Sequence, residues 1–529
     1  MRPESELLSL IRAMNKQEKR YFKLYATAFV RKRGGNKLTE LFDAYAALNA
    51  DADEAEVVKR LSDAPTPRQL ATARYELTNL ILNSLATYNA GKSADAELRA
   101  MLAHIQILYN KGLYDHCRKV VSRARAKARE LDYFSYMIEI LAWERKLLLR
   151  QAGVHFEESL RRFHDEQLTL LEQIAATIRY EDLADRVQEA HRAYVRLKDA
   201  SARIKLDEIV QSDLLNADPD GLPFHARLAM HQARGNYDWF VGNVSAAMNN
   251  YRLAIETWEA QPQHIRDDPD NFKRYLTNFL SCAIAIHEFD DFQQTLRKIK
   301  SLPSASVESD ITVFGIVTYL ELVFYLHNGQ LEEARGVVKE FELAAPRYVG
   351  RLRPDRLINL YYNCSMIYFL SGDYGGALRH INDILNEHNA EPKRDIQDFT
   401  RIVRLVIHYE LNDFDALENM FRSAQRYLNN RGQLNNFEKS VISAVRRLLN
   451  AADKTQRRAV ISDLRTALLD MLQDDDGADP LGLIEILFWT ESKLRKRPID
   501  ELFSRSIKAN RGRNKRELFT NSLDAEANP

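Results

Sequence analysis

The sequence predicts an all-helical protein built from a repeated pair of antiparallel helices. Apolar residues recur with the helical period, strand signals are nearly absent, and short turns return along the chain at a near-constant interval. The chain has 529 residues, of which 45% are hydrophobic and 28% charged. This composition is enough to build one extended array with a continuous core and a charged surface.

The region 357–385 shows the repeated unit most clearly. The apolar positions of its first helix, spaced i, i+4, i+7 and i+11, are Leu357, Tyr361, Cys364 and Tyr368. Gly372 then ends this helix, because glycine accepts the left-handed conformation of a helix C-terminus. A second apolar stripe runs from Tyr374 to Leu385. Two amphipathic helices joined by so short a turn pack antiparallel.

Small and large residues alternate in this segment in a recognisable order. The residues that carry the pattern are Tyr361, Ser365, Tyr368, Gly372, Asp373, Tyr374 and Ala377. Over residues 358–392 the pattern resembles the tetratricopeptide repeat (TPR). The resemblance implies an elongated right-handed TPR-like α-solenoid, in which the first helix of each pair lines a concave groove. The stretch 18–25 also resembles uncharacterised bacterial helical-repeat proteins, which implies no function.

Weaker copies of the turn recur on both sides of this unit. Marking each turn by one residue gives Tyr114, His155, Asp199, Val244, Phe292, Leu331, Tyr374, Phe414 and Lys454. Successive marks lie about 40 to 50 residues apart, which indicates helices longer than those of the simple repeat. Proline is excluded from helix interiors, so prolines should fall between helix pairs. Those expected there are Pro219, Pro223, Pro262, Pro269, Pro303, Pro346, Pro354 and Pro392.

We expect four regions along the chain. They are a helical N-terminal cap or bundle (1–92), TPR-like repeats (93–475), C-terminal capping helices (476–510) and a polar tail (511–529). In the cap, Asn15 followed by Glu18 predicts a capping box at the start of a helix.

Residues for common chemistries are absent. The sequence lacks the P-loop, dinucleotide-binding, H-E-x-x-H and G-x-S-x-G motifs. Cys117, Cys282 and Cys364 form no C-x-x-C pair and align with core positions of the repeat. We therefore expect no enzymatic activity, cofactor or metal, and an enzyme with an unrecognised active site remains one alternative. Without a signal peptide or an uncharged apolar run of bilayer length, the protein is expected to be cytoplasmic and away from membranes.

The favoured function is a protein–protein interaction scaffold or adaptor that binds a peptide, helix or protein surface in the groove. The resemblance places these residues in the groove: Gln106, Tyr109, Asn110, His287, Glu288, His327, Tyr362, Asn363, Met366, Phe369, Tyr409 and Glu410. Asn363 stands where some peptide-binding members clamp a C-terminal carboxylate, but the basic partners of such a clamp are not evident.

Two basic regions leave contact with DNA or RNA as a further alternative. The N-terminal region contains Lys16, Lys19, Arg20 and Lys23, continued by Arg31, Lys32 and Arg33. The C-terminal region contains Lys493, Arg495, Lys496, Arg497, Arg505, Lys508, Arg511, Arg513, Lys515 and Arg516. The whole chain balances 75 basic against 75 acidic residues, so overall charge does not favour nucleic acid over protein. The sequence leaves the oligomeric state open.

Overall fold

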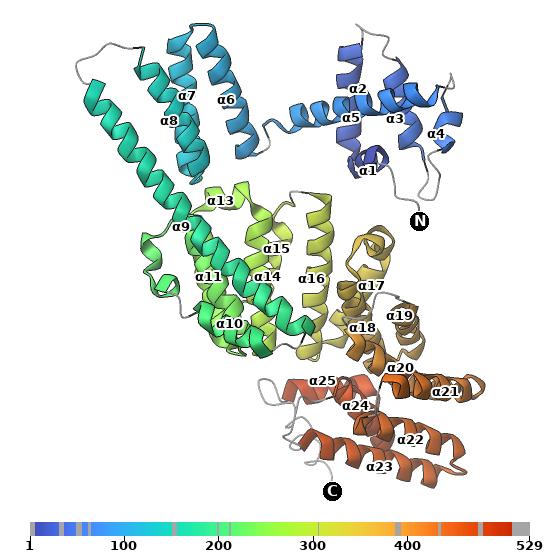
Figure 1. The fold of residues 1–529 in the computed structure, drawn as a ribbon. Coiled ribbons are helices and arrows are strands. Elements are labelled where there is room, and N and C mark those ends of the chain that lie inside the picture. The colour runs from blue at the N-terminus through green and yellow to red at the C-terminus, as the bar shows by residue number, and fades with distance from the viewer. Residues whose placement is uncertain are drawn as a thin grey trace. The chain divides into compact units, whose positions relative to one another are not determined.

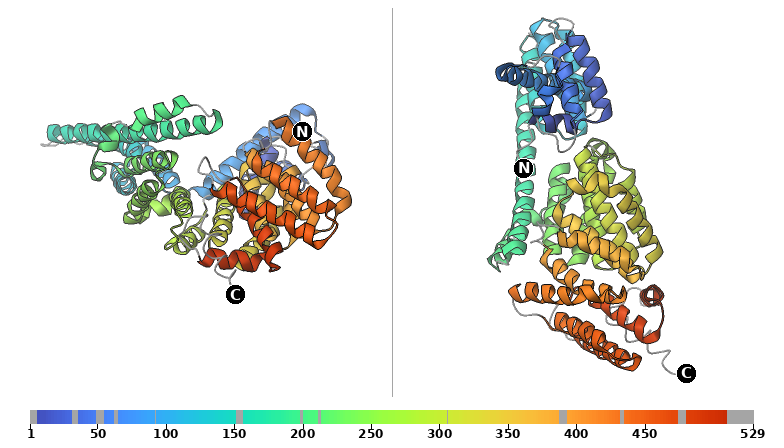
Figure 2. Two further views of the ribbon diagram at one scale, coloured as in Figure 1. Left: turned by 90° about the horizontal axis from the view of Figure 1, so that it is seen from below. Right: turned by 90° about the vertical axis from the view of Figure 1, so that its right-hand side faces the viewer.

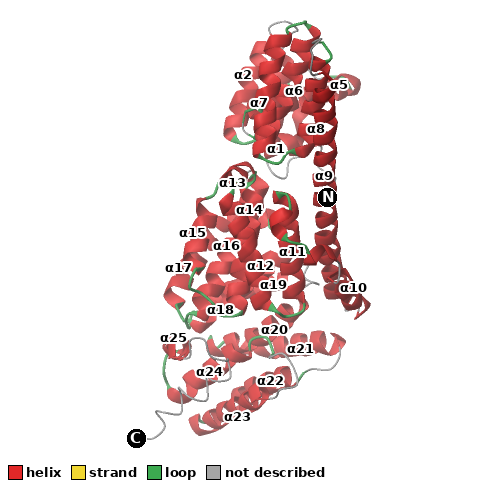
Figure 3. Ribbon diagram, turned by 90° about the vertical axis from the view of Figure 1, so that its left-hand side faces the viewer, coloured by secondary structure: helices red, strands yellow, loops and turns green. Residues whose placement is uncertain are grey.

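A computed structural model describes residues 6–30, 36–48, 55–61, 65–91, 93–150, 156–197, 200–210, 213–304, 306–386, 393–431, 435–473 and 480–509. The protein is 87% helical, and Figure 3 shows helices and loops without a strand in these ranges. The prediction of an all-α protein is confirmed. The chain divides into two compact units. Figure 1 shows the helices along the chain. Unit 1 comprises Met1–Ala233 with Thr257–Asp268, and unit 2 comprises Arg234–Glu256 with Pro269–Pro529.

Unit 1 begins with a small bundle that has its own core. Its helices are α1 (Glu6–Ala13), α2 (Lys16–Val30), α3 (Asn36–Ala46), α4 (Ala55–Lys59) and α5 (Pro67–Asn89). The predicted capping box starts α2: the Glu18 amide donates to the Asn15 side chain at 2.9 Å, and the Asn15 amide donates to the Glu18 carboxylate at 2.8 Å. Phe22, Phe42 and Ile81 are fully buried in the bundle core.

Unit 1 continues with longer helices. They are α6 (Ala94–Asn110), α7 (Tyr114–Glu130), α8 (Phe134–Leu148), α9 (Phe156–Leu197), α10 (Ala200–Val210) and α13 (Pro262–Asp267), with the short 3-10 helices η1 (Asp213–Asn216) and η2 (Pro219–Gly221). The division between the units falls within α11 (Phe224–Phe240) and α12 (Val244–Ala260). It therefore lies inside the region 93–475 that the sequence analysis assigns to the repeats.

Unit 2 is a series of helix pairs followed by two further helices. Its remaining elements are α14 (Pro269–Ala285), α15 (Phe292–Ser301), α16 (Val307–His327), α17 (Leu331–Tyr348), η3 (Val349–Arg351), α18 (Pro354–Leu370), α19 (Tyr374–Asn386), α20 (Arg394–Glu410), α21 (Phe414–Arg431), α22 (Asn436–Asn450), α23 (Lys454–Gln473), α24 (Leu483–Arg495) and α25 (Ile499–Ala509). Consecutive helices such as α18 and α19, or α22 and α23, pack side by side (Figure 1 and Figure 2).

One backbone motif joins the helices at eight turns of the described residues. In each, a residue in the left-handed conformation is followed by an amide that donates to the carbonyl five residues earlier, as in a Schellman motif. The left-handed residues are Gly112, Asp132, Gly242, His287, Gly329, Gly372, Asn412 and Lys496. At Gly372, for example, the Asp373 amide donates to the Tyr368 carbonyl at 2.9 Å. Helix ends are thus set locally by residues that tolerate a positive φ.

Seven of the nine predicted turn marks are the first residues of helices. These helices are α7, α12, α15, α17, α19, α21 and α23. The marks His155 and Asp199, and also Pro392, lie outside the described residues. One proline expectation is wrong, because Pro346 lies within α17 rather than between helices. Pro346 is two residues from the end of α17, so it interrupts only the last turn.

The C-terminal helices are part of the core of unit 2. Ile486, Phe488 and Trp489 of α24 are fully buried and share one hydrophobic cluster with the helices from α16 to α23. The helix α16 is apolar enough to meet the length and hydropathy of a membrane span, with a mean hydropathy of 1.5. It packs against α14, α17 and α18 inside this unit, as the core helix of a helical protein does.

Candidate functional site

The predicted groove residues are divided between the two units. Gln106, Tyr109 and Asn110 lie at the end of α6 in unit 1. Gln106 and Asn110 are exposed, whereas the Tyr109 ring packs against Tyr114 and Trp143 at centroid distances of 5.5 and 5.6 Å. The other nine residues belong to unit 2.

Three of those nine residues are buried. Asn363 is 8% exposed, Met366 1% and Phe369 0%. These three side chains therefore do not line an open surface, and the helices that pack against α18 include α24 and α25. Tyr362 lies on the same face of α18 as Met366 and Phe369, and its pKa is raised by burial and by Glu485 of α24. The chain's own C-terminal helices therefore cover this face of α18.

Two other predicted residues come together at adjacent turns. The Nδ1 atoms of His287 and His327 lie 3.1 Å apart. His287 is exposed and His327 is half-buried. Glu288, which is also exposed, lies 3.6 Å from the guanidinium of Arg252 on α12.

The last two, Tyr409 and Glu410, line a cleft where the ends of several helices meet. The cleft has a volume of about 550 Å³. Its walls come from α20, α21, α22, α23, α24 and the residues next to them: Tyr409, Glu410, Asn412, Phe414, Leu448, Lys454, Thr455, Arg457, Arg458, Ile461, Lys493, Leu494 and Lys496. We call this the α20–α24 cleft. Five consecutive helices contribute to it, and α24 packs against α23.

The α20–α24 cleft is strongly basic. Its lining includes one carboxylate, Glu410, and five cations: Lys454, Arg457, Arg458, Lys493 and Lys496. All five cations are exposed. Lys454 is the first residue of α23, so the positive end of that helix dipole adds to their field. The cleft therefore attracts anionic groups, although the whole chain has a formal charge of zero.

Glu410 supports the cleft wall. The Trp489 indole donates to the Glu410 carboxylate at 2.9 Å, and the Lys493 ammonium forms an ion pair with it. Because Trp489 is fully buried, these bonds fix the end of α20 to α24. Burial also raises the pKa of the neighbouring Tyr409, an effect that Arg457 opposes and Glu410 reinforces. The Tyr409 hydroxyl therefore stays protonated and can donate a hydrogen bond near neutral pH.

Apolar side chains form the floor of the cleft and part of its wall. Phe414 is 47% exposed, and its ring lies 6.2 Å from that of Tyr409. Leu448 and Ile461 are buried beneath the polar rim. Leu411 is 43% exposed at the adjacent turn. The cleft thus combines a cationic rim with apolar surface that could contact an apolar side chain.

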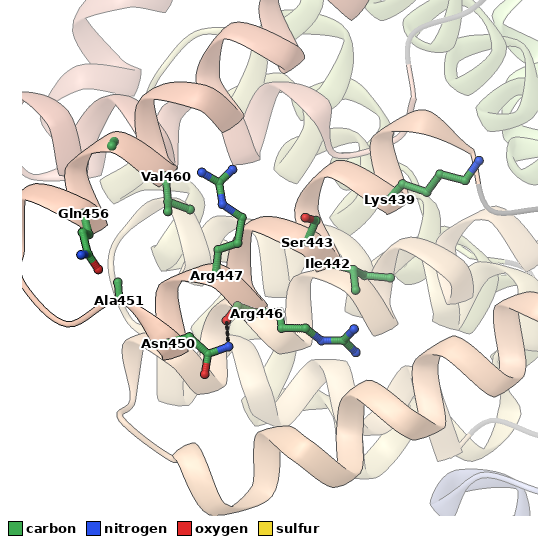
Figure 4. Close-up of a pocket in the computed structure, with 10 residues that line it drawn as sticks. Lys439, Ile442, Ser443, Arg446, Arg447, Asn450, Ala451, Gln456 and Val460 are labelled. Carbon is green, nitrogen blue, oxygen red and sulfur yellow. Dashed lines mark hydrogen bonds between the residues drawn. The ribbon is translucent and has the colours of Figure 1, made fainter.

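A second hollow, of about 610 Å³, lies between α22 and α23 (Figure 4). Its cations are Lys439, Arg446 and Arg447, whose side chains point in different directions in Figure 4. The Arg447 guanidinium lies 2.7 Å from the Asp463 carboxylate, and the Arg446 guanidinium lies over the Phe421 ring at 5.2 Å. The hollow therefore lacks a convergent set of polar groups.

The N-terminal basic residues are only partly available to a partner. Lys16 and Arg20 are exposed on α2, and Lys19 is half-buried. Lys23 forms an ion pair with Asp43 at 2.7 Å. The continuation of this patch at 31–33 lies outside the described residues.

The C-terminal basic residues do not form one continuous surface. Arg495 pairs with the buried Glu491 at 2.7 Å, and Arg497 lies 3.8 Å from Glu501. Lys493 and Lys496 instead line the α20–α24 cleft. Arg511, Arg513, Lys515 and Arg516 fall beyond the last described residue.

The sequence analysis missed most of the cleft cations. The turn pattern marks Lys454 as a helix start, and Arg457 and Arg458 follow it within the first turns of α23. A search for cations in the first turn of a helix would have found Lys454 and Arg457, since most helices favour acidic residues there. No residue pattern indicates that Lys493 and Lys496 of a later helix lie beside them.

Comparison with known proteins adds no functional assignment to this geometry. The chain matches no family model, no curated protein and no solved structure.

Proposed function

We propose that this protein is a TPR-like helical scaffold that holds an acidic segment of a partner protein in the α20–α24 cleft. The observation that carries the proposal is the charge of the cleft: five exposed cations surround one carboxylate that is already bonded within the wall. The repeated Schellman turns and paired helices support a right-handed solenoid of the tetratricopeptide kind.

The chemistry of the cleft favours an acidic peptide that also carries an aromatic or aliphatic residue. Carboxylates of the partner would meet Lys454, Arg457 and Lys496, while an apolar side chain would contact Phe414. A volume of about 550 Å³ suits a few side chains rather than a duplex. The cations are also gathered in one cleft instead of forming the long stripe that tracks a phosphate backbone.

The test is the binding of a short fluorescein-labelled peptide of glutamates and phenylalanines, measured by fluorescence anisotropy. The cleft variant carries Lys454→Glu and Arg457→Glu, which lie three residues apart on one face of α23. Acidic residues suit the first turn of a helix, so this variant should fold normally. The matched control carries Lys16→Glu and Arg20→Glu on α2, a second exposed basic pair.

We expect the cleft variant to bind the peptide roughly five- to thirtyfold more weakly than wild type. Each lost exposed ion pair contributes about 0.5–1 kcal/mol, and reversal of both charges removes about 1–2 kcal/mol. The control should bind like wild type. Equal affinity of both variants for the peptide would contradict the proposal.

A labelled single-stranded oligothymidine, titrated in the same way, examines the nucleic-acid alternative. Oligonucleotide binding that exceeds peptide binding, falls steeply between roughly 50 and 200 mM salt and is lost in the α2 variant would favour that alternative. The proposal requires the opposite result: the peptide binds more tightly, and the α2 variant leaves its affinity unchanged.

A further inference from the structure

The turn after α14 has an unusual left-handed residue for a Schellman turn. Glycine, asparagine or aspartate occupies that position in six of the other seven turns, and Lys496 occupies it in the seventh. Here His287 has a φ of 58°. A residue other than glycine is uncommon in this region of backbone space, where asparagine, aspartate and histidine are the most frequent exceptions. The helix end alone does not require a histidine, since glycine serves at four of the other turns.

At this turn the His287 ring lies against a second histidine. The Nδ1 atoms of His287 and His327 are 3.1 Å apart, and the ring centroids 4.8 Å apart. Phe289 contacts both rings, at centroid distances of 6.3 and 6.4 Å, and itself packs on Phe324. The two imidazoles are therefore held together on an aromatic base, and His287 remains accessible to solvent.

The surroundings of the two rings favour a cation. His327 is the last residue of α16, and His287 follows the last turn of α14, so the negative ends of two helix dipoles point toward the site. Glu288 adds a carboxylate next to His287, although Arg252 at 3.6 Å offsets part of its charge. The field therefore attracts a positive ion to the nitrogen atoms.

We propose that His287 and His327 bind a divalent transition metal ion, such as Zn²⁺, Ni²⁺ or Cu²⁺, through their Nδ1 atoms. Two nitrogen ligands about 2.0–2.1 Å from a tetrahedral ion lie about 3.3 Å apart, which is within a few tenths of an ångström of the observed separation of the Nδ1 atoms. Imidazole suits these ions. The structure holds no cluster of three or more ligating side chains among its described residues, so water or a donor from another molecule completes the coordination. This inference is independent of the proposed function of the α20–α24 cleft.

The experiment is isothermal titration calorimetry of the full chain with zinc chloride near neutral pH. The variants are His287→Gly and His327→Ala, and the control is His104→Ala, which removes an exposed histidine of unit 1. Wild type and the control should bind one equivalent of zinc with the same affinity. Each site variant should bind zinc at least about tenfold more weakly than wild type. Removing a group that only supports a metal ligand already weakens metal binding by about tenfold, so removing a ligand should weaken it at least as much.

His287→Gly also separates loss of a ligand from loss of the fold. Glycine stands at the same position in four other turns, so this variant should unfold at the same temperature as wild type or higher while its zinc binding is lost. Zinc binding that survives in both site variants, or a wild-type chain that binds no zinc, would mean that the histidines share only a hydrogen bond and would overturn the proposal.

Discussion

Replacing Gly482 with alanine tests whether α24 is a fixed part of the core of unit 2. Gly482 precedes α24 with a φ of 82°, and an added Cβ would lie 1.9 Å from ring atoms of Phe399 on α20. The left-handed backbone costs an alanine about 1–2 kcal/mol. Displacing the Phe399 ring in a packed core costs about 1–3 kcal/mol more. The substitution should therefore lower the free energy of unfolding by about 2–5 kcal/mol.

The matched control is Gly372→Ala, which lies in the same unit. Gly372 has a φ of 72°, but nothing lies within 4 Å of an added Cβ. The control should lose only about 1–2 kcal/mol, from the backbone term alone. Guanidinium denaturation followed by circular dichroism and by tryptophan fluorescence measures both variants, and the buried Trp489 on α24 reports on this region. Equal destabilisation by the two substitutions would refute the packing of α24 against α20.

Two further predictions concern buried side chains. Burial lowers the pKa of His264 to about 4, below the value of about 6.5 in the unfolded chain, so the stability of unit 1 should fall as the pH drops from about 6.5 toward 4. The His264 ring stacks on Phe224 at a centroid distance of 3.7 Å, and His264→Phe keeps this contact. The variant should make the midpoint of chemical denaturation less dependent on pH. An unchanged pH dependence would show that other groups cause the loss of stability. The three cysteine side chains are fully buried, and burial raises the pKa of each thiol, so none should react with a thiol reagent in the native protein near pH 7. Rapid labelling of any of them without denaturant would contradict the described core.

The sequence predicted the local structure well because helix ends depend on neighbouring residues. Glycine at 372 predicted the end of α18, and Asn15 with Glu18 predicted the start of α2, since each acts through backbone groups within a few residues. Pro346 shows the limit of this reasoning, because the last turn of a helix tolerates a residue that its middle excludes.

The candidate sites could not be located in this way. Periodicity placed Met366 and Phe369 on one face of α18. The apolar residues of such a face have the same spacing whether the face lines a groove or a core. The helix α24, which packs against α18, follows much later in the sequence. The α20–α24 cleft likewise collects Lys454 and Lys493 from helices that no local pattern relates.

The sequence by itself therefore determined the helical class, most of the turns and the absence of familiar catalytic motifs, because these depend on short-range spacing and backbone preference. Only the tertiary structure decided which faces remain open to a partner. In the folded chain, the C-terminal helices α24 and α25 pack against α18. The Nδ1 atom of His287 lies 3.1 Å from that of His327, forty residues away in the sequence. Accessibility and convergence of side chains depend on contacts between distant helices, and local periodicity carries no information about those contacts.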